Sequence, residues 1–205
     1  MTGFRVINLL MLLEELGEDE CKSILSEFSC PLNGDVEAFL RDKAIPFARQ
    51  RWAQTHLVFA SYQQKWVLVG YYTLANKTIC IRDSSLKKHS GTLRKRISRF
   101  ASHDHDAKAY ILSAPLIGQL GKNYNHGYDS LITGDELLSE ACRHIGRIQY
   151  NLGGRFAYLE CEDNPKLIEF YASNGFCAFQ NRMLDADETN LNGEYLVQMI
   201  KYIRS

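Results

Sequence analysis

The order of elements in the second half of the chain constrains its fold most. Apolar runs bounded by polar residues alternate there with segments whose apolar residues recur at helical spacing. The last of these helical segments, Asn164–Tyr171, begins with a capping Asn followed by a Pro at the first helical position. The pattern predicts strand, loop, helix, strand and helix over Lys108–Gly121, Lys122–Gly134, Asp135–Tyr150, Arg155–Glu162 and Asn164–Tyr171.

The predicted loop Lys122–Gly134 is polar, rich in turn formers and leads into a helix. The first N–H groups of a helix have no partner inside it, and the helix dipole is positive at that end. If this loop binds a ligand, we therefore expect an anion such as a phosphate over Gly134.

Composition narrows the protein class. A chain of 205 residues that is 45% hydrophobic can bury one sizeable core, so we expect a single domain over residues 1–205. Residues 1–27 are predicted to be an N-terminal helical extension of that domain. The 24 Lys and Arg residues balance the 24 Asp and Glu residues, so net charge favours neither nucleic acid nor a membrane.

Cysteine usage and the absence of long apolar runs predict a cytoplasmic protein. The six cysteines contain no CxxC pair, which favours reduced core residues over disulfides or zinc ligands. No run reaches transmembrane length, and the first residues lack the small-residue cleavage site of a signal peptide. The alternating residues His103-Asp-His105-Asp are typical of a solvated loop, so no metal is expected.

Before the central block, the chain predicts helices first and then strands. Residues 7–28 have helical spacing with a break at Gly17, and Asp35–Arg51 has it with a kink or split expected at Pro46. The β-branched and aromatic runs His56–Ser61 and Trp66–Ala75 flank a polar turn and predict a hairpin, with a third strand over Lys77–Arg82. Together with the central block, this order suggests a mixed sheet with helices on its faces.

Ser84–Ser102 differs from the rest of the chain because it concentrates basic residues and has few acids. It is predicted to be helical, with either a solvated basic face or a contact surface for RNA or for adenosine phosphates between Lys87 and Arg99. The basic residues are Lys87, Lys88, Arg94, Lys95, Arg96 and Arg99.

Several short motifs, in this order, resemble the GNAT family of N-acetyltransferases. LVGYYTLA resembles the central strand of the family's first meander, and LIGQLGKN resembles its splayed acetyl-CoA strand. EFYASNGF resembles the family's C-terminal motif, which is the most specific of these signatures. FSCPLNGDVEAFLRDKA is similar to the branch that includes bacterial toxin acetyltransferases. The segments are Leu68–Ala75, Leu116–Asn123, Glu169–Phe176 and Phe28–Ala44.

This resemblance implies an α/β (α+β) fold with a GNAT-like mixed, mostly antiparallel sheet flanked by helices. It implies an acyltransferase that moves an acetyl group from acetyl-CoA directly to a primary amine in a ternary complex, with acetyl-CoA as cosubstrate. The cosubstrate is expected between Leu116–Asn123 and Arg155–Glu162. The toxin branch would make the amine of aminoacyl-tRNA the acceptor, and family members often form homodimers.

The same resemblance assigns roles to individual residues. Main-chain N–H groups of Leu120, Gly121 and Lys122 would polarise the thioester and pair with pantetheine. Tyr171 would protonate the leaving thiolate, because a phenol with a pKa of about 10 is a suitable donor; its other reading is a core aromatic. The pyrophosphate would lie on the main chain of Leu131, Ile132, Thr133, Gly134 and Asp135.

Two further roles have structural alternatives of equal weight. Glu160 and Glu162 lie on one side of the strand, and one of them, Glu160 in our assignment, could be the general base; the alternative is a solvated strand end. Asn164 could bond the pantetheine arm, cap the last helix, or do both.

One departure from the family pattern affects the phosphate loop. The family has Arg or Gln at the position of Asp129 and Gly at the position of Ile132, while the final Gly134 is kept. Because main-chain N–H groups make the contacts, we expect the loop to bind the pyrophosphate in the same way despite these changes. The alternative is a non-catalytic relative that binds CoA or acts as an interaction module.

Overall fold

The computed structural model describes residues 3–185 and 193–204. Most of the acidic segment 185–193, predicted to be a loop, lies outside the described residues. The chain forms two compact units, and each is described by itself below. Unit 1 comprises Met1–Ala75 and Ile117–Ala141, and unit 2 comprises Asn76–Leu116 and Cys142–Ser205. The single domain expected from the sequence stays a prediction.

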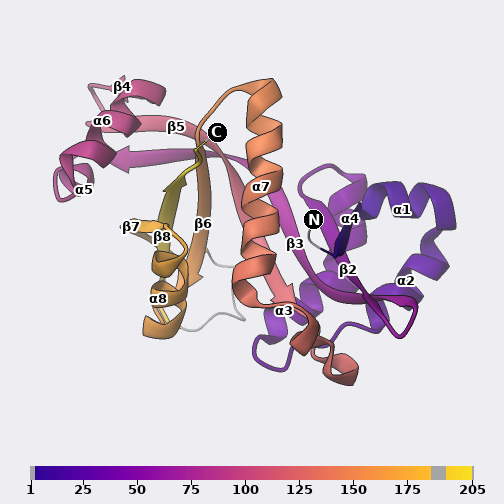
Figure 1. Ribbon diagram of the computed structural model, residues 1–205. Coiled ribbons are helices and arrows are strands. Elements are labelled where there is room, and N and C mark those ends of the chain that lie inside the picture. Colours follow the sequence, from indigo (N-terminus) through magenta and orange to yellow (C-terminus); the bar gives the residue numbers. More distant parts are fainter. Residues whose placement is uncertain (1–2, 186–192, 205) are drawn as a thin grey trace. The chain divides into compact units, whose positions relative to one another are not determined.

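In the described residues, eight strands form one sheet in the order β1-β2-β3-β5-β6-β8-β7, with β4 paired to β5 (Figure 1). The pairs β1–β2, β2–β3, β4–β5, β6–β8 and β7–β8 are antiparallel. The predicted mixed, mostly antiparallel sheet flanked by helices is therefore confirmed. The strands are β1 (Phe4–Asn8), β2 (Gln54–Tyr62), β3 (Lys65–Arg82), β4 (Ser102–Asp104), β5 (Ala109–Lys122), β6 (Phe156–Glu162), β7 (Cys177–Met183) and β8 (Tyr195–Tyr202).

The predicted hairpin is present as β2 and β3, joined by the two residues Gln63 and Gln64. Both have positive φ, 48° and 64°, as a type I′ turn requires. The separate third strand over Lys77–Arg82 is wrong, because β3 runs without interruption from Lys65 to Arg82.

Unit 1 begins with a strand that the sequence prediction placed in a helix. The side chain of Asn8 at the end of β1 accepts from the N–H groups of Leu10 and Met11, so α1 (Leu9–Leu16) begins only after it. Gly17, with φ 82°, ends α1 as predicted and separates it from α2 (Glu18–Ser26).

The second predicted helix departs from a regular α-helix just before Pro46, close to where a kink or split is expected. The segment consists of α3 (Gly34–Ala38), the π-helical turn η1 (Phe39–Lys43) and α4 (Ala44–Arg49). A proline has no N–H for the carbonyl four residues earlier and clashes with that carbonyl, so the regular ladder cannot continue through it. The wider turn, in which the Ala44 N–H bonds the Phe39 oxygen, absorbs this defect just before the proline.

The first helices are part of the core of unit 1, not only an extension of it. The residues of α1 and α2 pack in one apolar cluster with those of η1, β2 and β3. Among its fully buried members are Leu9, Leu25, Phe28, Leu40, Leu57 and Tyr71.

Unit 2 has a separate apolar cluster to which β6, β7, β8 and the helices α5 (Asp83–Leu86) and α6 (Gly91–Phe100) contribute. The cluster includes Ile81, Ile97, Phe156, Tyr158 and Ile200. Unit 2 also contains α8 (Pro165–Ser173). The helix α7 (Gly134–Leu152) begins in unit 1 and ends in unit 2. His103 and Asp104, predicted to lie in a loop, belong to the short strand β4.

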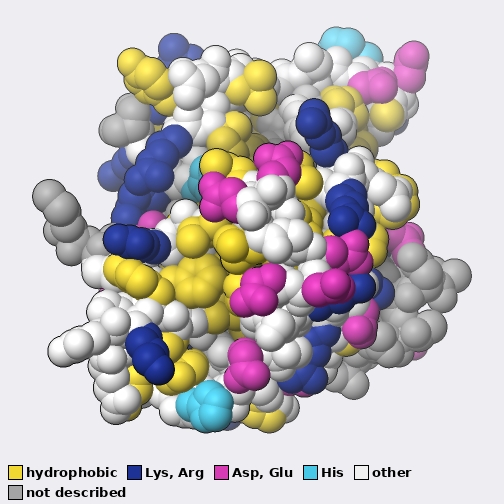
Figure 2. Space-filling model, turned by 90° about the vertical axis from the view of Figure 1, so that its right-hand side faces the viewer, with side chains coloured by type: hydrophobic (Ala, Val, Ile, Leu, Met, Phe, Trp, Pro, Cys, Tyr) yellow, Lys and Arg dark blue, Asp and Glu magenta, His cyan; other side chains and the backbone are white. Residues whose placement is uncertain are grey.

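The charges on the surface are mixed, and the cysteines are reduced, as the sequence predicts. On the face shown in Figure 2, acidic and basic side chains are interspersed, with hydrophobic side chains visible between them. All six cysteines are free; four are buried, while Cys80 and Cys177 are exposed. Within the described residues, no helix is long and apolar enough to cross a membrane.

Candidate functional site: the start of α7 and the α8 region

Asn123 ties the end of β5 to the first part of the chain and fixes where the predicted phosphate loop starts. Its side chain is fully buried. Its amide group donates to the main-chain oxygens of Glu27 and Leu68 at 3.1 and 2.9 Å, and its Oδ1 accepts from the N–H groups of Ser29 and Asn125 at 2.9 and 3.0 Å. One side chain thus satisfies four main-chain groups from three separate segments.

The predicted cofactor residues Leu120, Gly121 and Lys122 are the last three residues of β5. A Cβ on Gly121 would lie 2.4 Å from Cγ1 of Val36 and 3.3 Å from Phe28, so any larger residue would collide with α3. Close packing in unit 1 therefore explains this glycine without a ligand.

The loop after β5 is more ordered than the sequence suggests. Residues Asn125–Leu131 form a 3₁₀ segment, η2, interrupted where His126 and Gly127 have positive φ. The ammonium group of Lys122 reaches into it and donates to the main-chain oxygen of Asp129 at 3.0 Å. Lys122 therefore holds the loop, a role that its side chain would keep with or without pantetheine.

The start of α7 is closed by a capping box that the sequence prediction missed. Oγ1 of Thr133 accepts from the Glu136 N–H at 3.1 Å. In return, Oε2 of Glu136 accepts from the N–H and the hydroxyl of Thr133 at 2.8 and 2.9 Å. The readable signal was Thr133-x-x-Glu136, the pattern of such a box.

This box changes how an anion would bind at Gly134. The hydrogen bonds from the Thr133 N–H and then from its hydroxyl hold the pKa of Glu136 below its usual range, so the carboxylate is charged at neutral pH. It takes up the N–H and the hydroxyl of Thr133, whose main chain was predicted to bind the pyrophosphate. The side chain of Ile132 is buried, so this residue, like Gly134, offers only its main chain. The first turn also carries the exposed acid Asp135 beside Glu136.

Tyr171, the predicted acid, lies in α8 of unit 2. Its ring contacts Phe170 and Phe176 with centroid distances of 5.0 and 6.0 Å. Burial, with a smaller contribution from Cys161, raises the pKa of Tyr171 well above its usual value. The phenol is therefore protonated at neutral pH, as a proton donor must be. Its aromatic neighbours are also those expected of a core aromatic residue, which was the alternative interpretation.

Glu160, the predicted base, is occupied by a hydrogen-bond network on one face of β6, β8 and β7. Arg182 binds its two oxygens with Nε at 3.1 and 3.0 Å and with a terminal nitrogen at 2.8 Å. Tyr158 and Gln198 donate to its Oε1, and Gln180 in turn donates to the Gln198 side chain at 2.8 Å.

The network makes Glu160 a weak base. Burial alone would raise the pKa of Glu160, but hydrogen bonds from Arg182, Tyr158 and Gln198 outweigh it and hold the pKa below its usual value. A carboxylate with a lowered pKa and filled lone pairs is poorly suited to take a proton from an amine. Its position thus favours a structural role, and the partner Arg182, 22 residues away in sequence, gave no signal.

Asn164 has the capping role expected as one of its two readings. Its Oδ1 accepts from the Lys166 N–H at 2.9 Å at the start of α8. Its amide NH₂ is not part of this cap, so a donor remains for the second reading.

The predicted basic helix is two helices, α5 and α6, joined by a turn. No ion pair involves any of its six Lys and Arg residues in the part of the chain that the structure describes. Arg96 lies over the Tyr202 ring at 4.4 Å. The other five basic residues are exposed, namely Lys87, Lys88, Arg94, Lys95 and Arg99. The same described residues contain no cluster of three or more side chains that could bind a metal.

Comparison with known proteins shows a likeness in structure only. No protein-family model matches the chain, and no curated protein matches it by sequence. Solved structures do match. A mutant of the AtaT toxin bound to the C-terminus of the antitoxin AtaR and acetyl-CoA has 15% identity and a TM-score of 0.58, covering 98% of this chain and 93% of that one.

Two other solved structures are similar to the same extent. AtaT complexed with acetyl-methionyl-tRNAfMet has 18% identity and a TM-score of 0.57, covering 95% of this chain and 93% of that one. A mutant of KacT has 16% identity and a TM-score of 0.59, covering 96% and 94%. At such identities the likeness establishes the fold, and it agrees with the GNAT-like toxin fold that the sequence predicts.

Proposed function

We propose that this protein is an N-acetyltransferase that moves an acetyl group from acetyl-CoA to a primary amine. The observation that carries the proposal is the likeness over almost the whole chain to AtaT, which has been solved with acetyl-CoA. The start of α7 supports it, since β5, a loop and a helix N-terminus follow one another in unit 1 as an anion site requires.

The reaction needs few groups from the protein. The amine nitrogen attacks the thioester carbonyl, a C–N bond forms, and the C–S bond breaks. The amine loses a proton and the thiolate of CoA gains one, so the products are an amide and free CoA. Tyr171 is proposed to give its phenolic proton to the thiolate. The main chain at Leu120–Lys122 is proposed to polarise the thioester carbonyl.

Water is proposed to accept the proton from the amine, because the hydrogen-bond network occupies Glu160. Glu160 itself is proposed to hold β6, β7 and β8 together through Arg182. The Glu160→Gln variant separates these roles, because a lost base lowers the rate strongly while a lost ion pair lowers mainly the stability.

The proposed acceptor is the α-amine of an aminoacyl-tRNA, and the setting is the bacterial cytoplasm. AtaT has been solved with acetyl-methionyl-tRNAfMet. In the described part of this chain, five basic residues of α6 and of the turn before it are exposed and take part in no ion pair, namely Lys87, Lys88, Arg94, Lys95 and Arg99. A cationic surface of this kind suits the phosphate backbone of RNA.

The first experiment is calorimetric titration with acetyl-CoA, beside dephospho-CoA and free pantetheine. Binding that weakens strongly without the pyrophosphate part supports a phosphate site at the start of α7. Absence of binding to the folded protein would contradict the proposed activity. Acetylation of charged initiator and elongator tRNAs, compared with simple amines, then identifies the acceptor, and slow growth on expression is expected if tRNA is the acceptor.

Tyr171→Phe tests the proton donor. We expect kcat to fall by about 10- to 100-fold while the affinity for acetyl-CoA stays within about threefold, because the hydroxyl acts on the leaving group. Tyr195→Phe is the matched control, since this tyrosine of unit 2 bonds Asp163 and has no proposed role. Unchanged turnover in Tyr171→Phe would leave Tyr171 as a packing residue.

A second function is favoured by the capping box. The charged Glu136 side chain occupies part of the α7 N-terminus, and Ile132 stands where the resembling family has Gly. A non-catalytic protein that binds its partner through the basic helices would combine this closed loop with the same fold. Binding of RNA without binding of acetyl-CoA would support that alternative.

A further inference from the structure

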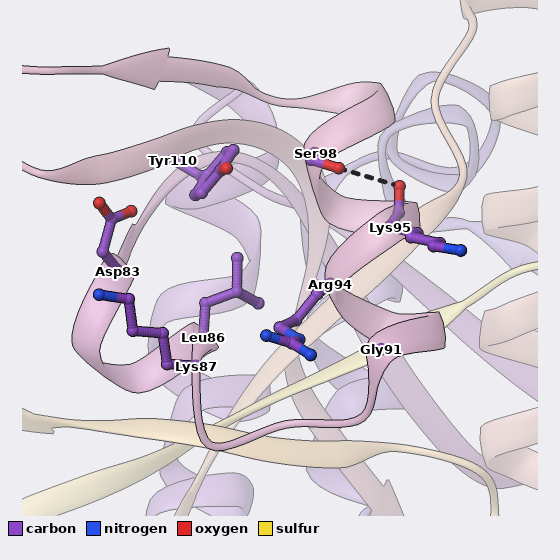
Figure 3. Close-up of a pocket in the computed structure, with 8 residues that line it drawn as sticks. All are labelled: Asp83, Leu86, Lys87, Gly91, Arg94, Lys95, Ser98 and Tyr110. Atoms are coloured by element: carbon purple, nitrogen blue, oxygen red, sulfur yellow. Dashed lines mark hydrogen bonds between the residues drawn. The ribbon is translucent and has the colours of Figure 1, made fainter.

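A pocket in unit 2 lies beside the basic helices and is made of none of the residues proposed for acetyl transfer. Its volume is about 410 Å³, within the range of small-molecule sites. Residues of α5, of α6 and of the first part of β5 form its walls (Figure 3). They are Asp83, Leu86, Lys87, Gly91, Arg94, Lys95, Ser98 and Tyr110.

Arg94 makes one side of the pocket cationic. Figure 3 shows Arg94 pointing across the pocket toward Leu86, while Lys95 points away from it. The terminal nitrogen of Arg94 lies 3.9 Å from the position of a Cβ on Gly91, the first residue of α6. A guanidinium group and the N–H groups of a helix start thus share one place, and both favour an anion.

The two cations of the wall come from different sides of the pocket. Figure 3 shows Lys87 beside Leu86 at the end of α5, with its ammonium group toward Asp83, while Arg94 comes from α6. Within the described residues, neither Lys87 nor Arg94 takes part in an ion pair. The one acidic residue of the wall, Asp83, has both carboxylate oxygens 3.1 Å from Nε2 of His103. The hydrogen bond to His103 holds the Asp83 carboxylate in place, and within the described residues neither Lys87 nor Arg94 forms an ion pair with it.

Two residues give the pocket apolar surface, Leu86 and Tyr110. Leu86 is buried and forms part of the wall, and Tyr110 is half-buried. The Tyr110 ring lies 4.6 Å from the His103 ring, and this contact together with the Asp83–His103 pair fixes where it stands. An aromatic ring held this way is a suitable surface for a planar group.

We propose that this pocket binds a nucleotide, with the phosphate at Arg94 and Lys87 and the base against Leu86 and Tyr110. A phosphate monoester has the double charge that two unpaired cations favour, and a nucleobase supplies the planar apolar group for the apolar surface. The nucleotide comes either as a free mononucleotide or as the phosphorylated end of an RNA. In both cases the pocket is separate in residues from the proposed acetyl-CoA site.

The test titrates the full chain with AMP, adenosine and inorganic phosphate, in the absence and in the presence of saturating acetyl-CoA. We expect AMP to bind at least about tenfold more tightly than either part alone, because the cations and the apolar surface hold different groups. Arg94→Gln should weaken AMP binding by about tenfold, and Lys87→Gln by several-fold. Lys88→Gln is the matched control, as this neighbouring cation does not line the pocket, and it should change binding by less than about twofold.

Two further arms identify the source of the nucleotide. A short RNA with a 5′-phosphate that competes with AMP and binds more tightly than its 5′-hydroxyl form identifies the RNA end. AMP binding without such competition identifies a free nucleotide. Each result supports the pocket.

Other results overturn the proposal. Equal binding of AMP and phosphate, or equal losses in Arg94→Gln and Lys88→Gln, would mean a general basic surface. Displacement of AMP by acetyl-CoA together with no effect of Arg94→Gln would place AMP in the acetyl-CoA site. If acetyl-CoA fails to bind while Arg94-dependent AMP binding persists, the proposed acetyl transfer fails and the nucleotide pocket stands.

Discussion

Two carboxylates with lowered pKa values, Glu136 in unit 1 and Glu160 in unit 2, show how differently a fold can use the same group. Glu136 is exposed and bonded to the main chain and hydroxyl of a residue three positions away. Glu160 has a side chain only 11% exposed and is held by Arg182 of a different strand. One rotamer change would free the Glu136 carboxylate from Thr133. Moving the Glu160 carboxylate would break its hydrogen bonds to Arg182, Tyr158 and Gln198.

This difference decides which carboxylate can take part in function. A lowered pKa is often a mark of an active site, but it follows equally from ion pairs that hold a fold together. Glu160 belongs to the second kind, because an arginine, a phenol and an amide satisfy it. Glu136 occupies a helix start where an anionic ligand could take its place, so it can compete with that ligand.

The largest effect is expected where long-range contacts converge on one side chain, as they do at Asn123. Asn123→Leu would leave four main-chain groups without their partners and should lower the free energy of unfolding by about 3–5 kcal/mol. Asn125→Ala, at the neighbouring and less buried amide, should cost less than about 1 kcal/mol. Urea unfolding compares the two variants, and equal losses would show that the junction is not held by Asn123.

Arg182→Met tests whether Glu160 is structural. We expect a loss of about 2–3 kcal/mol at neutral pH, less than for a fully buried pair because the Arg182 side chain is 23% exposed. Arg182→Met combined with Glu160→Gln should recover part of it, because no unpaired charge remains.

The pH dependence gives a second check on Glu160. Its folded-state pKa lies below the ordinary value of 4.5, so its stabilising contribution is present above pH 4.5 and lost as the pH falls through the folded pKa. Acid unfolding of Arg182→Met should therefore show a weaker loss of stability over this range than the wild type. An unchanged acid profile would mean that Arg182 does not set this pKa.

Variants of the capping box should change the free energy of unfolding less than the variants above. Removal of the Glu136 charge should strengthen the binding of acetyl-CoA. Thr133→Ala removes the cap of α7 and should cost about 1 kcal/mol. Glu136→Gln keeps the side-chain size but removes the competing charge, so acetyl-CoA should bind about two- to fivefold more tightly. Calorimetry measures both variants, and weaker binding by Glu136→Gln would show that Glu136 assists the ligand instead of competing with it.

Local patterns explain which parts of this structure the sequence could predict. The helix that begins at Gly134, the cap at Asn164 and the hairpin around Gln63 depend on residues a few positions apart, and each follows from its own segment. The capping box was also readable, since Thr133 and Glu136 stand three residues apart. Strand β1 was missed, because only Asn8 separates its apolar residues from those of α1 and the prediction began the helix at residue 7.

The contacts that sequence could not supply join distant segments. Asn123 bonds main-chain groups almost 100 positions away, and Arg182 of β7 reaches Glu160 of β6 across the one intervening strand, β8. Such partners depend on how strands are ordered in the sheet, which no local pattern determines. The roles assigned to single residues from the family resemblance therefore needed the structure most, as the occupied carboxylate of Glu160 illustrates.

The smallest expected effect concerns the hairpin turn, where a purely local feature is tested alone. Gln63 and Gln64 hold positive φ values that a side chain with a Cβ adopts only with strain. Replacing the pair by Asn-Gly should raise the free energy of unfolding by about 0.5–1 kcal/mol, because these residues adopt a type I′ turn readily. Acetyl-CoA and AMP binding should be unchanged, since neither proposed site includes the turn. If urea unfolding shows a loss instead, the two glutamines make contacts that outweigh the strain, and the turn would join Asn123 and Arg182 as a feature fixed by its surroundings.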